Sequence, residues 1–215
     1  MEKEKKTNKG LIALIIVIVC SCLLAAFLVL IPPILLAFGI VFEGINAKEE
    51  VITNFSQYTE VVGESAKGYY KRPWGFSEEI FPRKLKDTYD VKDFKSVYYN
   101  PWDANYLVYL EIDYDNEDYQ REVTRLKDLG IQKYKGYYGV TGFKNYELLA
   151  MAADEYNGFI YAITDEKENK IVYVEMIFCN YIMDIDYNKY IPKKYLPDGF
   201  DATSGNEYRK SKGFD

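Results

Sequence analysis

The chain has 215 residues, a formal charge of −6 and no histidine. The absence of histidine excludes catalytic triads with a histidine base and zinc sites with imidazole ligands. The negative charge argues against nucleic acid as a partner, because phosphate backbones attract basic surfaces. One hydrophobic run near the N-terminus leaves enough chain behind it for one soluble domain with its own core.

The hydrophobic run covers residues 11–42 and contains no charged side chain. About twenty such residues cross the roughly 30 Å hydrocarbon core of a bilayer, so the run predicts a transmembrane helix. Residues 11–31 are sufficient for the crossing, and Pro32 and Pro33 are expected to kink or end the helix, because proline lacks a backbone donor. Residues 34–42 then form a surplus apolar segment, expected near the outer interface or against a partner.

The charges on the two sides of the run differ in sign. Residues 1–10 carry a net charge of +2, so the rest of the chain carries −8. Lysine and arginine favour the cytoplasmic side of a membrane. We therefore expect a cytoplasmic tail at residues 1–10, an uncleaved signal anchor in the cytoplasmic membrane, and a C-terminal domain outside it. The expected partners are membrane lipid, through the helix, and a protein of the membrane or envelope.

Two processed forms of the N-terminus are alternatives to the signal anchor. A cleaved signal peptide has a shorter apolar core and small residues before the cut, whereas Leu24 precedes Ala26 at the required spacing. The stretch from Val19 to Cys22 loosely resembles a lipobox, which would imply lipidation of Cys22. The chain stays apolar after that cysteine, where lipoproteins have a polar tether.

A further resemblance concerns Lys9-Gly10, which is followed by an apolar helix with Pro32 at its twenty-second position and then by a soluble α/β domain. This arrangement resembles the N-terminus of type IV pilins and pseudopilins over roughly thirty residues. The resemblance implies cleavage after Gly10 and assembly through the helix. The family has a glutamate at the fifth mature position, where this chain has Ile15.

Apolar residues after the run recur at helical spacing, at Val51, Phe55, Tyr58 and Val62. This spacing predicts an amphipathic stalk helix over residues 43–63. We expect this helix to dock on its own domain rather than to form an oligomer.

Two segments lack such periodicity. Residues 63–87 contain several glycines and prolines among aromatic residues, which predicts irregular structure, with Trp74 and Phe76 packed against the domain. Residues 204–215 are expected to form a flexible tail. The extracytoplasmic domain is accordingly expected at residues 64–203.

One helix is predicted in the domain, over residues 116–129. Asp115 is placed to cap its N-terminus, and Gly130 stands where a C-terminal cap is expected. Tyr119 and Leu126 belong to its apolar stripe.

Alternating apolar residues predict strands before and after this helix. A polar turn joins the last two strands into a hairpin. The pattern predicts an α+β fold, a mostly antiparallel sheet with one packed helix. The predicted strands cover residues 92–99, 106–113, 146–153, 158–164 and 170–179, with a weaker pattern at residues 131–138 that glycines interrupt.

Candidate ligand-binding residues lie on these strands. Glu175 shares a strand face with Tyr173, and if that face points away from the helix it lies beside Tyr109 and Glu111. The four side chains would then line one open sheet surface, and a hydrolase with paired carboxylates about 5–10 Å apart is an alternative. Trp102 is predicted to be an exposed aromatic contact in a hairpin loop.

Two Asp-x-Asp pairs invite a calcium hypothesis. An EF-hand is excluded, because the glycine and glutamate that its sixth and twelfth positions require are missing. The first pair is explained by a strand end and a helix cap, so we predict no metal site and no cofactor. The pairs are Asp113 with Asp115 and Asp184 with Asp186.

The 22 tyrosines all lie after residue 57, where they suit core and half-buried packing or ligand recognition. The function predicted from these observations is that of a single-pass membrane-anchored protein with an extracytoplasmic, non-enzymatic binding or interaction domain. The alternatives are an extracytoplasmic hydrolase that uses the carboxylate pair and a pseudopilin-like structural subunit.

Overall fold

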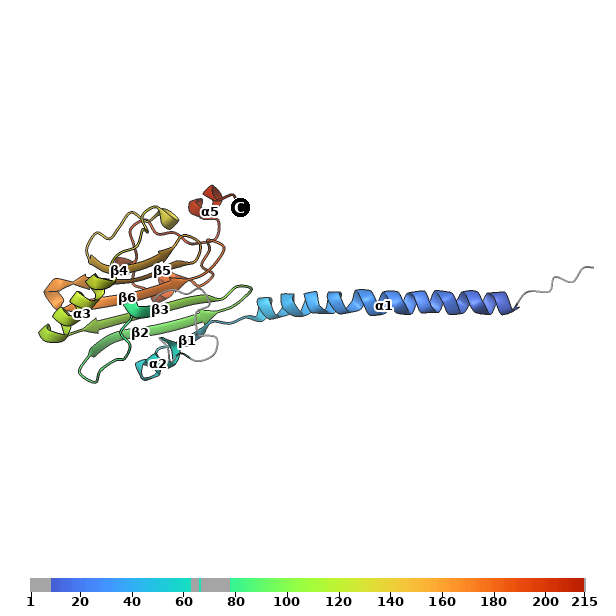
Figure 1. Cartoon of the computed structure of the whole chain (residues 1–215), viewed down its shortest axis with the longest axis horizontal. Coiled ribbons are helices and arrows are strands. Elements are labelled where there is room, and N and C mark those ends of the chain that lie inside the picture. The colour runs from blue at the N-terminus through green and yellow to red at the C-terminus, as the bar shows by residue number, and fades with distance from the viewer. Residues whose placement is uncertain (1–8, 63–65, 67–77, 215) are drawn as a thin grey trace, which may run out of the picture. The chain divides into compact units, whose positions relative to one another are not determined.

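The computed structural model describes residues 9–62, 66 and 78–214. The chain divides into two compact parts, one up to Asn46 and one from Ala47 onward (Figure 1). Most of the predicted cytoplasmic tail, together with Trp74 and Phe76, lies outside the described residues.

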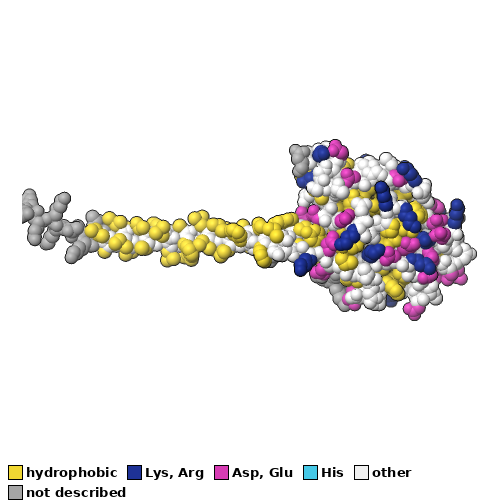
Figure 2. All heavy atoms as spheres, turned by 180° about the vertical axis from the view of Figure 1, so that it is seen from behind, with side chains coloured by type: hydrophobic (Ala, Val, Ile, Leu, Met, Phe, Trp, Pro, Cys, Tyr) yellow, Lys and Arg dark blue, Asp and Glu magenta, His cyan; other side chains and the backbone are white. Residues whose placement is uncertain are grey.

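The first part is the helix α1, Lys9–Asn46, which continues through Pro32 and Pro33. Of the two expectations for the proline pair, a kink or an end of the helix, the end is wrong. Each proline removes one backbone hydrogen bond, and the apolar residues on either side keep the rest of the helix. Ile12–Asn46 is long and apolar enough to cross a membrane by length and composition, and Figure 2 shows apolar side chains along the visible side of the helix.

The predicted stalk helix does not form. Residues after α1 enter a short strand, β1 (Glu50–Ile52), and then the helical turns η1 (Phe55–Gln57) and α2 (Tyr58–Val61). Strand pairing with the sheet overrides the helical spacing, because β1 forms backbone hydrogen bonds along an otherwise unpaired strand edge. Asn54 then begins η1 by accepting a hydrogen bond from the Ser56 backbone N–H.

The second part is built on a six-stranded sheet in which all neighbouring strands are antiparallel. The spatial order is β1-β2-β3-β6-β5-β4 (Figure 1). The predicted α+β class with an antiparallel sheet is confirmed. The remaining strands are β2 (Asp90–Tyr99), β3 (Asn105–Asp113), β4 (Glu147–Asp154), β5 (Gly158–Asp165) and β6 (Lys170–Ile177).

The predicted helix of the domain is α3, Asn116–Leu129, and its caps are confirmed. The Asp115 carboxylate accepts a hydrogen bond of 2.8 Å from the Asp118 backbone N–H. Gly130 ends the helix with φ of 78°, a left-handed conformation that favours glycine. Tyr119 and Leu126 are buried against one face of the sheet. The helix therefore packs on the sheet through its apolar stripe, as the sequence pattern predicted.

Both faces of the sheet are buried, and this corrects the expectation of an open face. The face under α3, which we call the helix face, buries Tyr173 and Ile177 of β6. The alternate residues Val172, Val174 and Met176 are buried on the opposite face, which we call the loop face. Strand residues alternate between the faces, so a strand covered on both sides is apolar almost throughout.

The loop face is covered mainly by irregular chain from residues 134–148 and 178–208. The weak strand pattern at 131–138 does not form a strand, since only Ile131 makes a bridge, with Met151. A left-handed Tyr138, with φ of 50°, turns this segment inward. The turn directs the Tyr138 ring into an aromatic cluster with Phe159, Phe178, Phe200 and Tyr208.

The C-terminal residues form a short helix, α5 (Glu207–Ser211), so the predicted flexible tail is corrected. Asn206 caps α5 by accepting a hydrogen bond of 2.8 Å from the Arg209 backbone N–H. The ring centroid of Tyr208 lies 4.8 Å from that of Tyr138. A capped helix whose aromatic residue packs on the domain is ordered by both contacts, although its sequence is polar.

Candidate functional site

The sheet register separates the predicted pair of carboxylates. Glu111 pairs with Val172, and Glu175 pairs with Val108. Residues that pair across neighbouring antiparallel strands point to the same face. Val108 lies in the core of the helix face and Val172 in that of the loop face. Glu111 and Glu175 therefore lie on opposite faces, and the predicted surface with both carboxylates does not exist.

Tyr173 and Glu175 are buried beneath α3 and are not accessible to a ligand from solvent. Both side chains are 0% exposed. The Tyr173 hydroxyl donates a hydrogen bond of 2.7 Å to Glu122 of α3, and the Tyr114 hydroxyl lies 2.7 Å from it. Since the Tyr173 proton points to Glu122, Tyr114 is the donor in the second bond. Burial raises the pKa of Tyr173 well above its usual value, so the chain of hydroxyls stays neutral.

Glu122 is also held by Arg125, one helical turn further along α3. The Arg125 guanidinium donates to both carboxylate oxygens, at 2.7 and 2.8 Å. The same guanidinium donates to the backbone carbonyls of Glu79 and Ile80. The bonds to the two carbonyls fix this segment to the helix, and the bidentate pair with Glu122 orients the guanidinium that makes them. Together they position the segment that leads to the groove described below.

Tyr109 and Glu111 lie on the loop face, where Lys170 joins them. The Tyr109 hydroxyl donates a hydrogen bond of 2.5 Å to Glu111, and the Lys170 ammonium lies 3.0 Å from the same carboxylate. Burial acts to raise the pKa of Glu111, but the bonds from Tyr109 and Lys170 outweigh it and hold the pKa below its usual value. The ring of Tyr195 stacks on that of Tyr109, with 6.1 Å between centroids. This arrangement is a covered ion pair that joins β3 to β6.

Trp102 lies in the hairpin between β2 and β3 and is 57% exposed, as predicted for an exposed aromatic residue.

The buried Cys179, which follows β6, lies at the same end of the sheet. Burial and the nearby Asp103 raise the pKa of Cys179 to about 12, so its thiol is protonated at neutral pH.

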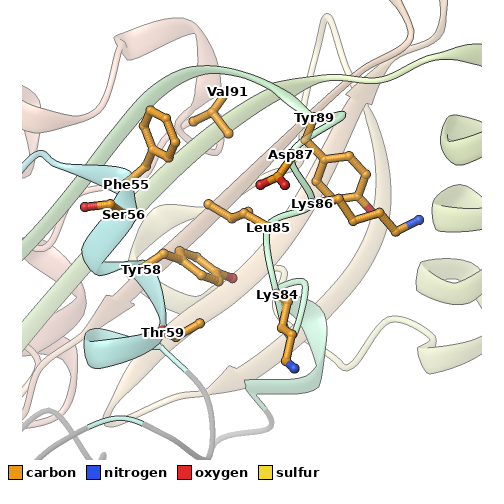
Figure 3. A pocket seen from close by; sticks show the side chains of 10 residues that line it. All are labelled: Phe55, Ser56, Tyr58, Thr59, Lys84, Leu85, Lys86, Asp87, Tyr89 and Val91. Atoms are coloured by element: carbon orange, nitrogen blue, oxygen red, sulfur yellow. The ribbon is translucent and has the colours of Figure 1, made fainter.

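A groove of about 530 Å³ opens at the edge of the helix face. Residues 55–59 line one side and residues 84–91 the other (Figure 3). Figure 3 shows Leu85 reaching toward Phe55 and Tyr58 across the groove. The Tyr58 hydroxyl donates a hydrogen bond of 2.7 Å to the Pro82 carbonyl, which joins the two sides at their base. We call this hollow the Lys84 groove.

The rim of the Lys84 groove carries charges of both signs. Lys84 and Asp87 are exposed at the rim. Lys86 forms an ion pair with Asp118, at 2.9 Å, and its ammonium lies 5.3 Å from the ring centroid of Tyr89. A hollow with an apolar floor and a few polar groups at its edge is typical of a ligand site.

A second hollow of about 490 Å³ adjoins the Lys84 groove and shares Lys84 and Tyr89 with it. Arg83, Arg125 and Leu129 line its other side. Arg125 is the residue that is bound to Glu122, so the inner wall of this hollow is fixed by the network under α3. The two hollows together flank the segment from Pro82 to Tyr89.

Sequence reasoning missed the Lys84 groove because its walls come from segments that are distant in the chain. Phe55 and Tyr58 fitted a helical spacing, and the residues around Leu85 fitted an irregular loop. Neither pattern indicates that the two segments meet. The apolar Leu85 between charged neighbours was the one local signal of a loop that packs against the domain.

The two predicted calcium pairs do not form a metal site in the described part of the chain. Among those residues, no three histidine, cysteine, aspartate or glutamate side chains are grouped to hold a metal ion. Asp115 of the first predicted calcium pair caps α3, and Asp184 of the second receives a bond of 3.5 Å from Asn105. Comparison with protein-family models, curated proteins and solved structures found no match for this chain.

Proposed function

We propose that the protein is a single-pass membrane protein whose extracytoplasmic domain binds another molecule in the Lys84 groove without transforming it. The membrane assignment is supported by α1 and its uncharged run at residues 11–42. The orientation, N-terminus inside, is supported by the net charge of +2 before the run and −8 after it.

One observation carries the binding role, namely that the Lys84 groove combines an apolar floor with an exposed cation. Leu85, Phe55 and Val91 offer apolar contact, and Lys84 stands at the rim. This chemistry fits a ligand with an apolar body and an anionic group, of the size of a small molecule or a short peptide segment. The groove is built on segments joined by the Tyr58 bond to Pro82, so it is largely formed before binding.

The hydrolase alternative is no longer proposed. It required Glu111 and Glu175 within about 10 Å in one cleft. The register places the two carboxylates on opposite faces, with Glu175 completely buried.

The proposed topology can be tested by protease treatment of intact cells that carry the full chain. We expect digestion within residues 50–215 and protection of residues 1–31, because only the domain is outside. Detergent permeabilisation is the control and should expose both ends. A domain that is untouched in intact cells but digested after permeabilisation would contradict the proposed orientation.

The binding role can be tested with Lys84→Glu in the full-length protein. The matched control is Lys193→Glu, since Lys193 is also an exposed lysine but does not line the groove. After solubilisation, we expect the species that co-purifies with the wild-type protein to be lost from Lys84→Glu and kept by Lys193→Glu. Equal recovery from both variants would reject the groove as the binding site.

A pseudopilin-like structural subunit remains the second candidate, and the unbroken helix that follows Gly10 favours it. Intact-mass analysis of the protein from its native membrane separates the two candidates. Loss of residues 1–10 would support the pseudopilin-like role. A mass that includes Met1 to Gly10 would reject it and leave the signal anchor.

A further inference from the structure

The register of the sheet defines one end of the domain, at which the chain arrives from α1. Pairing across the six strands aligns one row of residues at this end, from Glu50 of β1 to Asp154 of β4. Beyond the row lie the β2–β3 hairpin (residues 100–104), the β4–β5 turn (155–157) and the segment after β6 (178–182). We call these three segments, with α5 and Phe214, the proximal end.

The proximal end carries exposed aromatic rings. Trp102 is 57% exposed and Phe214 is 41% exposed. Tyr156 and Tyr181 are partly exposed beside each other, with ring centroids 5.0 Å apart, and Phe214 lies 5.5 Å from Tyr181. Rings of Trp and Tyr, with one apolar and one polar part, are the side chains enriched at the lipid–water interface.

The C-terminal helix is fastened to this end by polar contacts. The Arg209 guanidinium donates to the Asn180 carbonyl, and Lys212 forms an ion pair with Glu155 at 3.3 Å. These bonds hold the residues around Phe214 beside the β4–β5 turn. The aromatic rings of the proximal end thus come from separate segments that the fold brings together.

The covalent chain ties the proximal end closely to α1. Only Ala47, Lys48 and Glu49 separate the last residue of α1 from the first residue of β1. Glu49 is itself bound to the domain, because its carboxylate lies 3.0 Å from the Lys189 ammonium and accepts a hydrogen bond from Tyr190. A bilayer crossed by the whole apolar part of α1 would therefore be tethered to this end of the domain and to no other.

The length of α1 permits that placement. Residues 11–42 would extend about 48 Å as a helix, at 1.5 Å per residue. The hydrocarbon core together with the headgroup layers measures about 40–45 Å, and transmembrane helices tilt by about 20° on average. At that tilt the apolar run covers about 45 Å of depth, so its last residue, Phe42, would reach the outer headgroup layer.

We propose that the proximal end of the domain binds the outer lipid–water interface, with Trp102 as its main contact. This inference rests on the proposed function, in which α1 crosses the membrane. The acidic residues of the proximal end, Asp103, Glu155 and Glu207, are matched by Arg209 and Lys210 of α5 and by Lys212 directly after it, so the contact depends on aromatic rings rather than on net charge. The surplus apolar segment at residues 34–42 then lies within the membrane and its interface rather than beside a partner helix.

The test uses the full-length protein reconstituted in phosphatidylcholine vesicles that contain nitroxide-labelled lipid. The chain has two tryptophans, so Trp74→Phe leaves Trp102 as the single tryptophan, which is excited selectively on the long-wavelength side of tyrosine absorption. We expect nitroxide on the headgroup to quench Trp102 about twofold more strongly than nitroxide at the end of the acyl chain, because interfacial tryptophan lies at headgroup depth. Trp102→Phe is the matched variant. If Trp74→Phe fails to fold, the emission of Trp102 is obtained by subtracting the emission of Trp102→Phe from that of the wild-type protein.

A second emitter provides the internal control. In the chain without Trp74 and Trp102, a Glu168→Trp substitution places a tryptophan at the opposite end of the sheet, in the β5–β6 connection. We expect no headgroup quenching there. Unquenched Trp102 in vesicles that retain the protein would overturn the inference and would favour a domain raised above the surface. Protein that does not stay with the vesicles would instead contradict the membrane-spanning role of α1.

Discussion

The two faces of the sheet are both buried, but different interactions hold their covers. On the helix face, α3 is bound through Glu122, which accepts a hydrogen bond from the Tyr173 hydroxyl, and through Arg125, which donates to the Ile80 carbonyl. On the loop face, the cover is irregular chain anchored by aromatic rings around Tyr138 and by tyrosine hydroxyls that donate to backbone carbonyls, such as Tyr161 to Tyr195. A helix and a stretch of irregular chain therefore bury the two faces of the same sheet through different interactions.

This difference shows that a segment can cover the sheet stably without having a pattern that is recognisable in the sequence. A helix has its own backbone hydrogen bonds and needs only a stripe of apolar residues to be placed. An irregular segment must satisfy its backbone groups one by one, and the tyrosines of the loop face do so from the core. Gly139 and Gly199 allow two such segments to approach, because a Cβ on Gly139 would lie 2.7 Å from the Gly199 carbonyl oxygen.

The strongest way to break the loop face is Tyr138→Ala. Removing a buried ring that contacts Phe159 and Phe178 should lower the free energy of unfolding by about 3–5 kcal/mol. Thermal unfolding of the solubilised protein, followed by circular dichroism, measures the loss. Tyr138→Phe keeps the ring and should cost only about 1 kcal/mol, the value of its hydrogen bond to Glu155. Equal losses from both variants would refute the dominance of ring packing.

On the helix face, Glu122→Ala should lower the free energy of unfolding by less than Tyr138→Ala does on the loop face. The change leaves Arg125 without its carboxylate and Tyr173 without its acceptor, and we expect a loss of about 2 kcal/mol. The control is Glu117→Ala on the exposed side of α3, which should change stability by less than about 0.5 kcal/mol. A comparable effect of the two substitutions would mean that the network contributes nothing specific.

One hydroxyl on each face allows a matched comparison. Tyr161→Phe removes the bond of 2.9 Å to the Tyr195 carbonyl, and Tyr119→Phe removes the bond of 2.7 Å to the Thr164 hydroxyl. Each should cost about 1 kcal/mol in urea unfolding, since a buried acceptor loses its donor. Tyr161→Phe should in addition increase amide exchange around Tyr195, whereas Tyr119→Phe should leave that exchange unchanged.

The smallest effect concerns pH and the loop face. Because the folded-state pKa of Glu111 is lowered, its contribution to stability is present above the pKa of the unfolded chain and is lost as pH falls through the folded value. Unfolding should therefore become easier as the pH falls below 4.5, the usual pKa of a glutamate, and less steeply so in Glu111→Gln. Parallel pH curves for the two proteins would assign the acid sensitivity to other carboxylates.

Sequence reasoning predicted the elements that depend on local pattern. Asp115 and Gly130 marked the ends of α3, and alternation located the strands within a few residues. It did not predict β1, because three residues paired at a strand edge have no local signal that can outweigh helical spacing.

The candidate site was predicted wrongly for a related reason. Whether Glu111 and Glu175 share a face depends on the register between β3 and β6, and a shift of one residue would have brought them to the same side. The register is set by contacts between distant parts of the chain. The same applies to the Lys84 groove, whose walls meet only in the folded domain.

The buried thiol of Cys179 has a consequence for how the domain reacts with oxidants and alkylating reagents. Cys20 and Cys22 belong to α1, so the domain carries a single thiol, which is protonated and 6% exposed. Oxidants and alkylating reagents act on the thiolate, so the folded domain should react slowly and the unfolded chain quickly. The rate of alkylation at this one position then measures the rate of unfolding, and burial of the thiol protects the folded domain from forming disulfides with other chains.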